Sequence, residues 1–146
     1  MLRLVVECLR PGFPPRPRRS PGCSASPAAE SRVEERLGRV LICRECGTEI
    51  TSPDLGIEVA GSHRHTFFNP AGILYEIGCF CAAEGCLDMG QPSLEFSWFA
   101  GFGWRSSICR GCKIHLGWEF VSTADRVFWG LILNRLIEAQ RPEAKA

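Results

Sequence analysis

Apolar and polar residues recur with different periods along the chain, and the changes of period divide it into segments. Residues 1–27 hold six of the ten prolines together with repeated arginines, which leaves few side chains that a core could bury. This composition predicts a disordered tail over residues 1–27. An i, i+4, i+7, i+8 apolar repeat then predicts a short amphipathic helix over residues 28–39. The repeat consists of Val33, Leu37, Val40 and Leu41, and its last two positions lie directly after the predicted helix.

Beyond the predicted helix, the pattern changes to short β-type runs that are separated by turn residues. It predicts a mostly β domain over residues 40–138 and a C-terminal tail over residues 139–146. The expected strands are 57–60, 65–68, 73–80, 95–99, 104–108, 116–121 and 127–131, with a loop at 84–92 and a short helical segment at 134–140. The sequence Asn69-Pro-Ala-Gly72 has Pro and Gly where a type I turn favours them, which predicts a hairpin between the second and third strands.

Charge and hydropathy exclude several classes of partner. The formal net charge is +1 over 146 residues, which argues against a surface for nucleic acid or anionic membranes. No apolar run approaches the roughly 20 residues that a spanning helix needs. We therefore expect a soluble, cytoplasmic monomer that binds neither nucleic acid nor membranes.

The nine cysteines are odd in number and lack the spacing of a disulfide framework. Four of them form two Cys-x-x-Cys pairs, Cys43 with Cys46 and Cys109 with Cys112. Two such pairs predict one closed, structural zinc site that ties the start of the domain to its second half.

Two other roles for the cysteines stay open at this point. A redox dithiol is one, although it usually needs a single pair at a helix N-terminus. A second metal site is the other, and its ligands would be Cys79, Cys81, His63 and His65.

The segment 95–120 is rich in aromatic residues and is interrupted by glycines. It holds three of the four tryptophans and four of the nine phenylalanines. Trp118 and Phe120 are two apart in an expected strand, so they project from the same face. Gly101 and Gly103 allow a turn that brings Trp98 and Trp104 to meet them. The residues alone are compatible with a cage for a ligand or with an ordinary aromatic core.

The motifs FSWFAGFGW, CxxC and HLGWEF, with FNPAGILYEI before them and FWGLI after them, resemble the thalidomide-binding domain of cereblon, known as the CULT domain. The resemblance is greatest to its single-domain bacterial homologues and covers about two thirds of the chain, from Cys43 to Ile137. It implies a β-tent, in which two antiparallel sheets meet at an angle and are held by zinc on the four paired cysteines.

The resemblance also implies a ligand and a site. Family members bind cyclic imides such as glutarimide, uracil-like rings and cyclised C-terminal imides of proteins. The implied ligand-binding residues are Asn69 and Pro70 at the rim, Phe96, Ser97 and Trp98 in one loop, and Trp104, Trp118 and Phe120 as further walls. The Phe96 carbonyl and the Trp98 amide would bind the imide.

Three positions depart from the family pattern. Phe96 replaces a His of the vertebrate form, Ala100 a frequent Pro, and Phe102 a frequent Tyr. These changes bear on affinity more than on the class of ligand.

The main alternative function is that of an enzyme, a zinc-containing reductase similar to the B-type methionine sulfoxide reductases. Its nucleophile would have to be Cys79 or Cys81. The arginine-histidine-cysteine signature of that family is missing, because Arg64 and His65 are followed by Thr66. We expect a binding module with no catalytic residues.

Overall fold

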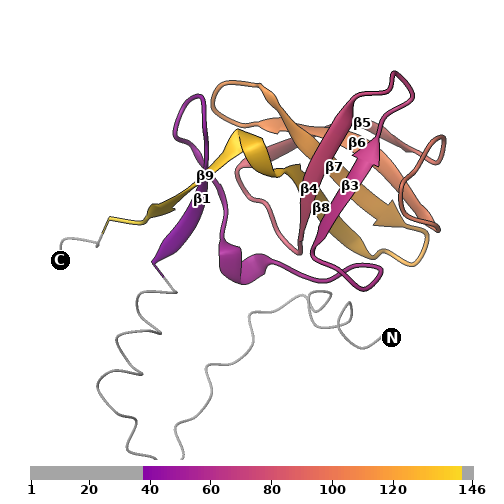
Figure 1. Ribbon diagram of the computed structural model, residues 1–146, viewed down its shortest axis with the longest axis horizontal. Coiled ribbons are helices and arrows are strands. Elements are labelled where there is room, and N and C mark those ends of the chain that lie inside the picture. Colours follow the sequence, from indigo (N-terminus) through magenta and orange to yellow (C-terminus); the bar gives the residue numbers. More distant parts are fainter. Residues whose placement is uncertain (1–37, 143–146) are drawn as a thin grey trace, which may run out of the picture.

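The computed structural model describes residues 38–142 (Figure 1). The predicted tail over 1–27, residues 28–37 of the predicted helix and residues 143–146 lie outside this range. None of the helices within it is long and apolar enough to cross a membrane.

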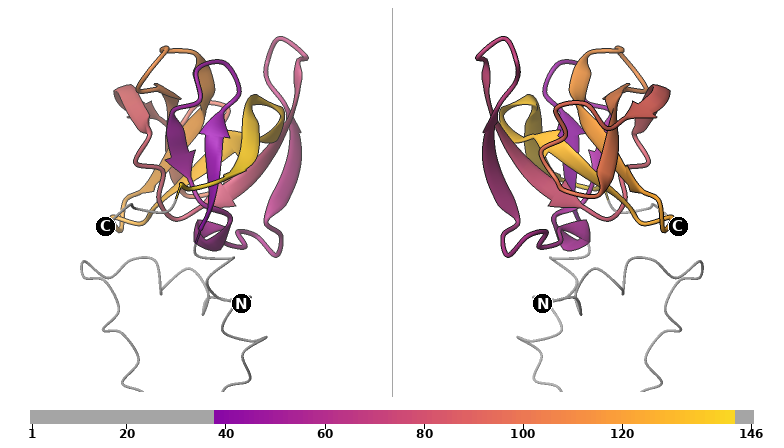
Figure 2. Two further views of the ribbon diagram at one scale, coloured as in Figure 1. Left: turned by 90° about the vertical axis from the view of Figure 1, so that its left-hand side faces the viewer. Right: turned by 90° about the vertical axis from the view of Figure 1, so that its right-hand side faces the viewer.

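The described chain forms two antiparallel sheets (Figures 1 and 2). The three-stranded sheet has the order β2 (Glu49–Thr51), β1 (Arg39–Cys43), β9 (Leu136–Gln140). The six-stranded sheet has the order β3 (Arg64–Phe68), β4 (Leu74–Phe80), β8 (Val127–Ile132), β7 (His115–Ser122), β6 (Phe102–Cys109), β5 (Cys86–Ser93). Residues 38–142 also contain two short 3-10 helices, η2 (Pro53–Leu55) and η3 (Leu133–Arg135). The predicted mostly β fold with two antiparallel sheets is confirmed.

Both ends of the domain differ from the prediction. Val40 and Leu41, which supplied the last two positions of the helical repeat, lie in β1. The predicted helical segment at 134–140 is wrong too, because most of it forms β9. Leu41 pairs with Glu138 in the register of β1 and β9. Each segment supplies the backbone partners of the other, and this pairing overrides their weak local helical pattern.

Three internal segments also differ from the prediction. The expected loop at 84–92 contains β5, which pairs only with β6 and carries a bulge between Met89 and Ser93. An edge strand needs little apolar alternation, so the pattern of apolar residues did not predict β5. The expected strand at 95–99 is a turn-rich connection, and the one at 57–60 makes only an isolated bridge from Val59 to Ser62.

The predicted hairpin is confirmed. The Gly72 amide donates to the Asn69 carbonyl at 2.9 Å, and the Ile73 amide donates to Asn69 Oδ1 at 2.8 Å. β3 and β4 pair antiparallel from Arg64 with Gly78 to Phe68 with Leu74. Figure 2 shows this hairpin standing at one side of the molecule.

Two clusters of buried residues divide the core between them. One contains Cys43, Cys109 and Leu136 and therefore joins residues of both sheets. The other is largely aromatic and includes Trp118, Phe120 and Phe128. The first cluster holds the sheets together, and the second supports a cavity on the six-stranded sheet.

Candidate functional site

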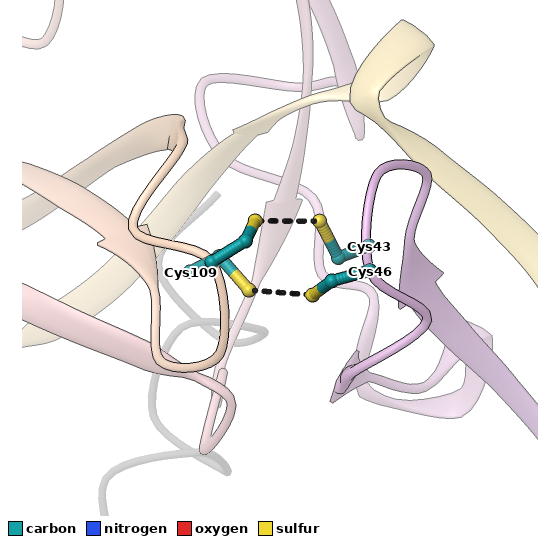
Figure 3. Close-up of side chains that lie close together, drawn as sticks. Cys43, Cys46 and Cys109 are labelled. Atoms are coloured by element: carbon teal, nitrogen blue, oxygen red, sulfur yellow. Dashed lines mark hydrogen bonds between the residues drawn. The ribbon is translucent and has the colours of Figure 1, made fainter.

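Four cysteines converge where the first strand of the domain meets the second half of the chain. Their ligand atoms all lie within 4.8 Å of one another. The Cys46 Sγ atom is 3.5 Å from that of Cys109, and the Cys43 Sγ atom is 3.7 Å from that of Cys112. Figure 3 shows Cys43 and Cys46 on one turn, facing the turn that carries Cys109. This four-cysteine group could bind a metal ion.

Two turns with the same backbone pattern position these sulfurs. In the first, the Gly47 amide donates to the Cys43 carbonyl at 2.9 Å. In the second, the Lys113 amide donates to the Cys109 carbonyl at 2.9 Å. Gly47 and Lys113 both have positive φ, of 75° and 67°. The two Cys-x-x-Cys pairs therefore lie in turns of the same conformation that face each other.

The two turns approach each other closely. A Cβ atom on Gly111 would lie 2.2 Å from Thr48 Oγ1, so a larger residue there would have to displace the Thr48 side chain. The Thr48 hydroxyl lies 3.1 Å from Cys46 Sγ, and this contact lowers the pKa of Cys46 to about 6. Burial raises the pKa of Cys43 in the same group, so the lowered pKa is a property of Cys46 and not of the four cysteines together.

The other proposed metal ligands do not form a group of this kind within residues 38–142. The ring nitrogens of His63 and His65 contact backbone carbonyls of Ile57 and Val59 instead. Cys79 is fully buried, and burial raises its pKa to about 12. That environment disfavours Cys79 as the nucleophile of a reductase.

A cavity of about 400 Å³ opens beside the six-stranded sheet. Its walls come from the β3–β4 turn, β4, the connection before β6, β6 and β7. The lining residues are Asn69, Pro70, Tyr75, Phe96, Trp98, Trp104, Ser106, His115, Trp118 and Phe120.

The aromatic walls meet at steep angles and so enclose space. Trp98 and Trp118 have ring centroids 4.7 Å apart with planes at 75°. Tyr75 lies edge-on to Trp118, with centroids 5.1 Å apart and planes at 78°. Phe120, which also lines the cavity, is buried and stacks on Phe128 with centroids 5.0 Å apart.

Two of the three cavity indoles use their N–H groups to hold the walls in place. Trp98 Nε1 donates to the Phe68 carbonyl at 3.1 Å, which ties the connection before β6 to the β3–β4 hairpin. Trp104 Nε1 donates to the Glu95 carbonyl at 2.6 Å. These donors are already engaged, so Trp98 and Trp104 offer a bound molecule their ring surfaces.

The connection before β6 bears a strained aromatic residue. Phe96 has a φ of 55°, a conformation that costs a non-glycine residue about 1–2 kcal/mol, and its side chain is 72% exposed. Ser97 follows it, and its hydroxyl donates to the Phe102 carbonyl at 2.6 Å. Ser97 thereby closes the turn that presents Phe96 and Trp98.

The structure brings most of the predicted ligand-binding residues to one cavity. All of them line it except Ser97, which supports the connection from behind. The sequence did not single out Tyr75, Ser106 or His115 as lining residues. Ser106 could have been found from the strand period, because it lies two residues after Trp104 in the same strand and so projects from the same face.

His115 forms part of the cavity's inner wall. Its ring lies edge-on to Trp118, with centroids 4.8 Å apart. Burial lowers the pKa of His115, and its Nε2 atom is buried without a hydrogen-bond partner among the described residues. Burial therefore favours the neutral form of the His115 imidazole.

Comparison with curated proteins shows that the chain is similar to cereblon. It is 34% identical over 112 residues to protein cereblon of Gallus gallus, which is 72% of this chain and 25% of that protein. It is 34% identical over 103 residues to protein cereblon of Xenopus tropicalis and 33% identical over 104 residues to that of Danio rerio. The chain spans about a quarter of the length of these relatives. No family model matches the sequence.

Proposed function

We propose that this cereblon-like CULT domain is a small-molecule binding module that captures cyclic imides or uracil-like rings in the cavity of Trp98, Trp104 and Trp118. The observation that carries the proposal is the cavity itself. It places three indoles around a space of about 400 Å³ and engages two of the indole N–H groups elsewhere.

The chemistry of a cyclic imide suits such walls. The imide edge presents an acceptor, a donor and an acceptor in a row, whereas the opposite edge consists of CH₂ groups. Indole faces cover the apolar edge and the ring faces. The polar edge needs partners that the walls do not provide, because a buried unpaired donor costs about 1–3 kcal/mol.

Backbone groups of the connection before β6 are the proposed partners. The Phe96 carbonyl would accept from the imide N–H, and the Trp98 amide would donate to an imide carbonyl. The strained φ of Phe96 supports this assignment, because such strain gathers at ligand-binding turns. Asn69 and Pro70, which line the cavity, would contact the ligand at its rim.

The same edge occurs in uracil and in the cyclised imide at the C-terminus of a damaged protein. All three ligands share the acceptor-donor-acceptor pattern, so one cavity serves them. Binding in this way requires no catalytic group. A cytoplasmic location and a monomeric state stay predictions.

We propose zinc as the metal of the four-cysteine group. Four thiolates that converge from two equivalent turns match the tetrahedral sulfur site that zinc prefers. Cys43, Cys46, Cys109 and Cys112 would hold it, and a closed site of this kind contributes to folding rather than to chemistry. None of these four cysteines lines the cavity, so the metal site and the ligand site are separate.

Intrinsic tryptophan fluorescence tests the binding proposal. The fourth tryptophan, Trp129, does not line the cavity and donates to Asp88 Oδ1 at 3.1 Å. In a Trp129→Phe background, the signal therefore comes from the three cavity indoles. Titration with glutarimide or uracil should change it saturably, whereas 2-piperidone, the same ring without the second carbonyl, should bind more weakly. No saturable change with either imide would refute the proposal.

A further inference from the structure

The four-cysteine group is unevenly exposed to solvent. Cys46 and Cys112 are exposed, whereas Cys43 and Cys109 are buried. The two close sulfur pairs, Cys46 with Cys109 and Cys43 with Cys112, each join different turns. Each pair thus combines an exposed cysteine with a buried cysteine of the opposite turn.

We propose that this group is also an oxidative modification site, at which a hydroperoxide oxidises Cys46 and Cys109 resolves the product to a disulfide. The proposal is independent of imide binding, because none of these cysteines lines the cavity. It rests on the 3.5 Å approach of the exposed residue Cys46 to the buried residue Cys109.

Hydrogen peroxide oxidises the pair in two steps. The Cys46 thiolate attacks one peroxide oxygen, the O–O bond breaks, and a sulfenic acid and hydroxide form. The Cys109 thiolate then attacks the Cys46 sulfur, an S–S bond forms, and the S–O bond breaks to release a second hydroxide. Two protons from solvent convert both hydroxides to water. The two sulfurs lose two electrons in total, and the peroxide gains them.

Geometry favours Cys109 as the resolving residue. Its sulfur lies 3.5 Å from that of Cys46, and it is shielded from the oxidant because it is fully buried. Cys86 is the competitor for Cys109, since it is the cross-strand partner of Cys109 between β5 and β6. A Cys86–Cys109 bond would lie within one sheet, whereas a Cys46–Cys109 bond would join the two turns.

The oxidised domain would keep a link that the metal otherwise provides. Loss of two thiolates would leave two sulfur donors, too few for a closed metal site. The new S–S bond would still join the turn after β1 to the end of β6. Oxidation would therefore release the metal without separating the two halves of the site.

The sequence makes the pairing easy to map. Trypsin cleaves after Arg44 and Arg110, which lie inside the two Cys-x-x-Cys pairs, so the four cysteines fall in four different peptides. These peptides are 40–44, 45–64, 106–110 and 111–113, and Cys79, Cys81 and Cys86 share a fifth, 65–105.

The experiment treats the zinc-loaded full chain with one equivalent of hydrogen peroxide. Zinc release is followed with a chromogenic chelator, and digests are analysed by mass spectrometry without reduction. We expect about one zinc to be released per disulfide and peptide 45–64 to be joined to peptide 106–110. Reduction with dithiothreitol in the presence of zinc should restore the starting state.

Other products would overturn the proposal. These are a link of 40–44 to 45–64 within one turn, a link of 65–105 to 106–110 through Cys86, or sulfinic acid on Cys46 as the main product. Cys86→Ser is the matched control and should leave the 45–64 to 106–110 link unchanged. The oxidised chain should also melt at a higher temperature than the reduced, chelator-treated chain, and an equal or lower melting temperature would contradict the retained link.

Discussion

Trp98 and Trp118 meet edge to face, with ring centroids 4.7 Å apart, although one lies in the connection before β6 and the other in β7. Their contact forms a corner of the cavity. Trp118 is 9% exposed and belongs to the aromatic core cluster, whereas Trp98 and Trp104 pack against that cluster from outside. The cavity is therefore an extension of the core, which gives its walls unequal roles in stability.

This inequality predicts different effects of truncating the walls. Trp104→Ala and Trp118→Ala should each weaken glutarimide binding by about 2 kcal/mol or more, roughly 30-fold, because each removes a buried aromatic contact. Trp118→Ala should also lower the melting temperature more than Trp104→Ala does, since it leaves a void in the core. Calorimetric titration and thermal melts measure both effects, and equal binding by either variant would count against the cage.

Metal removal should destabilise the domain. A metal analysis is expected to find one zinc per chain, and Cys43→Ser or Cys109→Ser should give poorly folded protein, because formation of the site is coupled to folding. Cys81→Ser, outside the four-cysteine group, is the control and should keep its zinc. A folded, ligand-binding preparation without metal would refute a structural zinc.

The environment of His115 predicts a pH dependence of stability. Burial lowers the pKa of His115 below its usual 6.5, so the unfolded chain binds this proton more readily than the folded chain does. Stability should therefore fall as the pH drops below about 6.5, and it should be fully present above that value. His115→Gln should flatten this part of the curve in thermal melts at constant zinc saturation. If the stability of His115→Gln falls with pH as steeply as that of the unchanged chain, the pH dependence comes from other groups.

Close approach of β7 and β8 predicts a position that tolerates only glycine. A Cβ atom on Gly117 would lie 2.1 Å from the Gly130 carbonyl oxygen. Gly117→Ala should therefore destabilise the fold by about 1–3 kcal/mol or more. Gly90→Ala is the control, because Gly90 has a φ of 77° with nothing near its missing side chain, and it should cost only the conformational strain of about 1–2 kcal/mol. Chemical denaturation compares the two.

The sequence predicted the parts of this domain in which local pattern and tertiary structure agree. The Asn69 to Gly72 turn and the strands of Trp104, Trp118 and Val127 carry strong local signals, and the structure confirms them. The two Cys-x-x-Cys pairs were predicted to come together because thiolates at this spacing bind a metal ion. Assembly of the four sulfurs follows from that chemistry rather than from any local preference.

Other parts could not be read from the sequence, because distant partners decide them. Leu41 is a strand residue since β9 pairs with it, and the polar edge strand β5 depends on β6. Tyr75 and His115 reach the cavity only because β4 and β7 belong to one sheet. Periodicity along the chain holds no information about such neighbours.

We propose that the cavity recognises the imide edge of its ligand, and N-methylation of the ligand tests this recognition most directly. If the Phe96 carbonyl accepts from the ring N–H, a methyl group on that nitrogen removes the donor. The buried carbonyl is then left without a hydrogen bond, at a cost of about 1–3 kcal/mol. Apolar burial alone would favour the methylated ring, because the methyl group adds apolar area. Calorimetric titration with glutarimide and N-methylglutarimide, side by side, should show at least roughly tenfold weaker binding of the methylated ring. Equal or tighter binding of N-methylglutarimide would contradict the account.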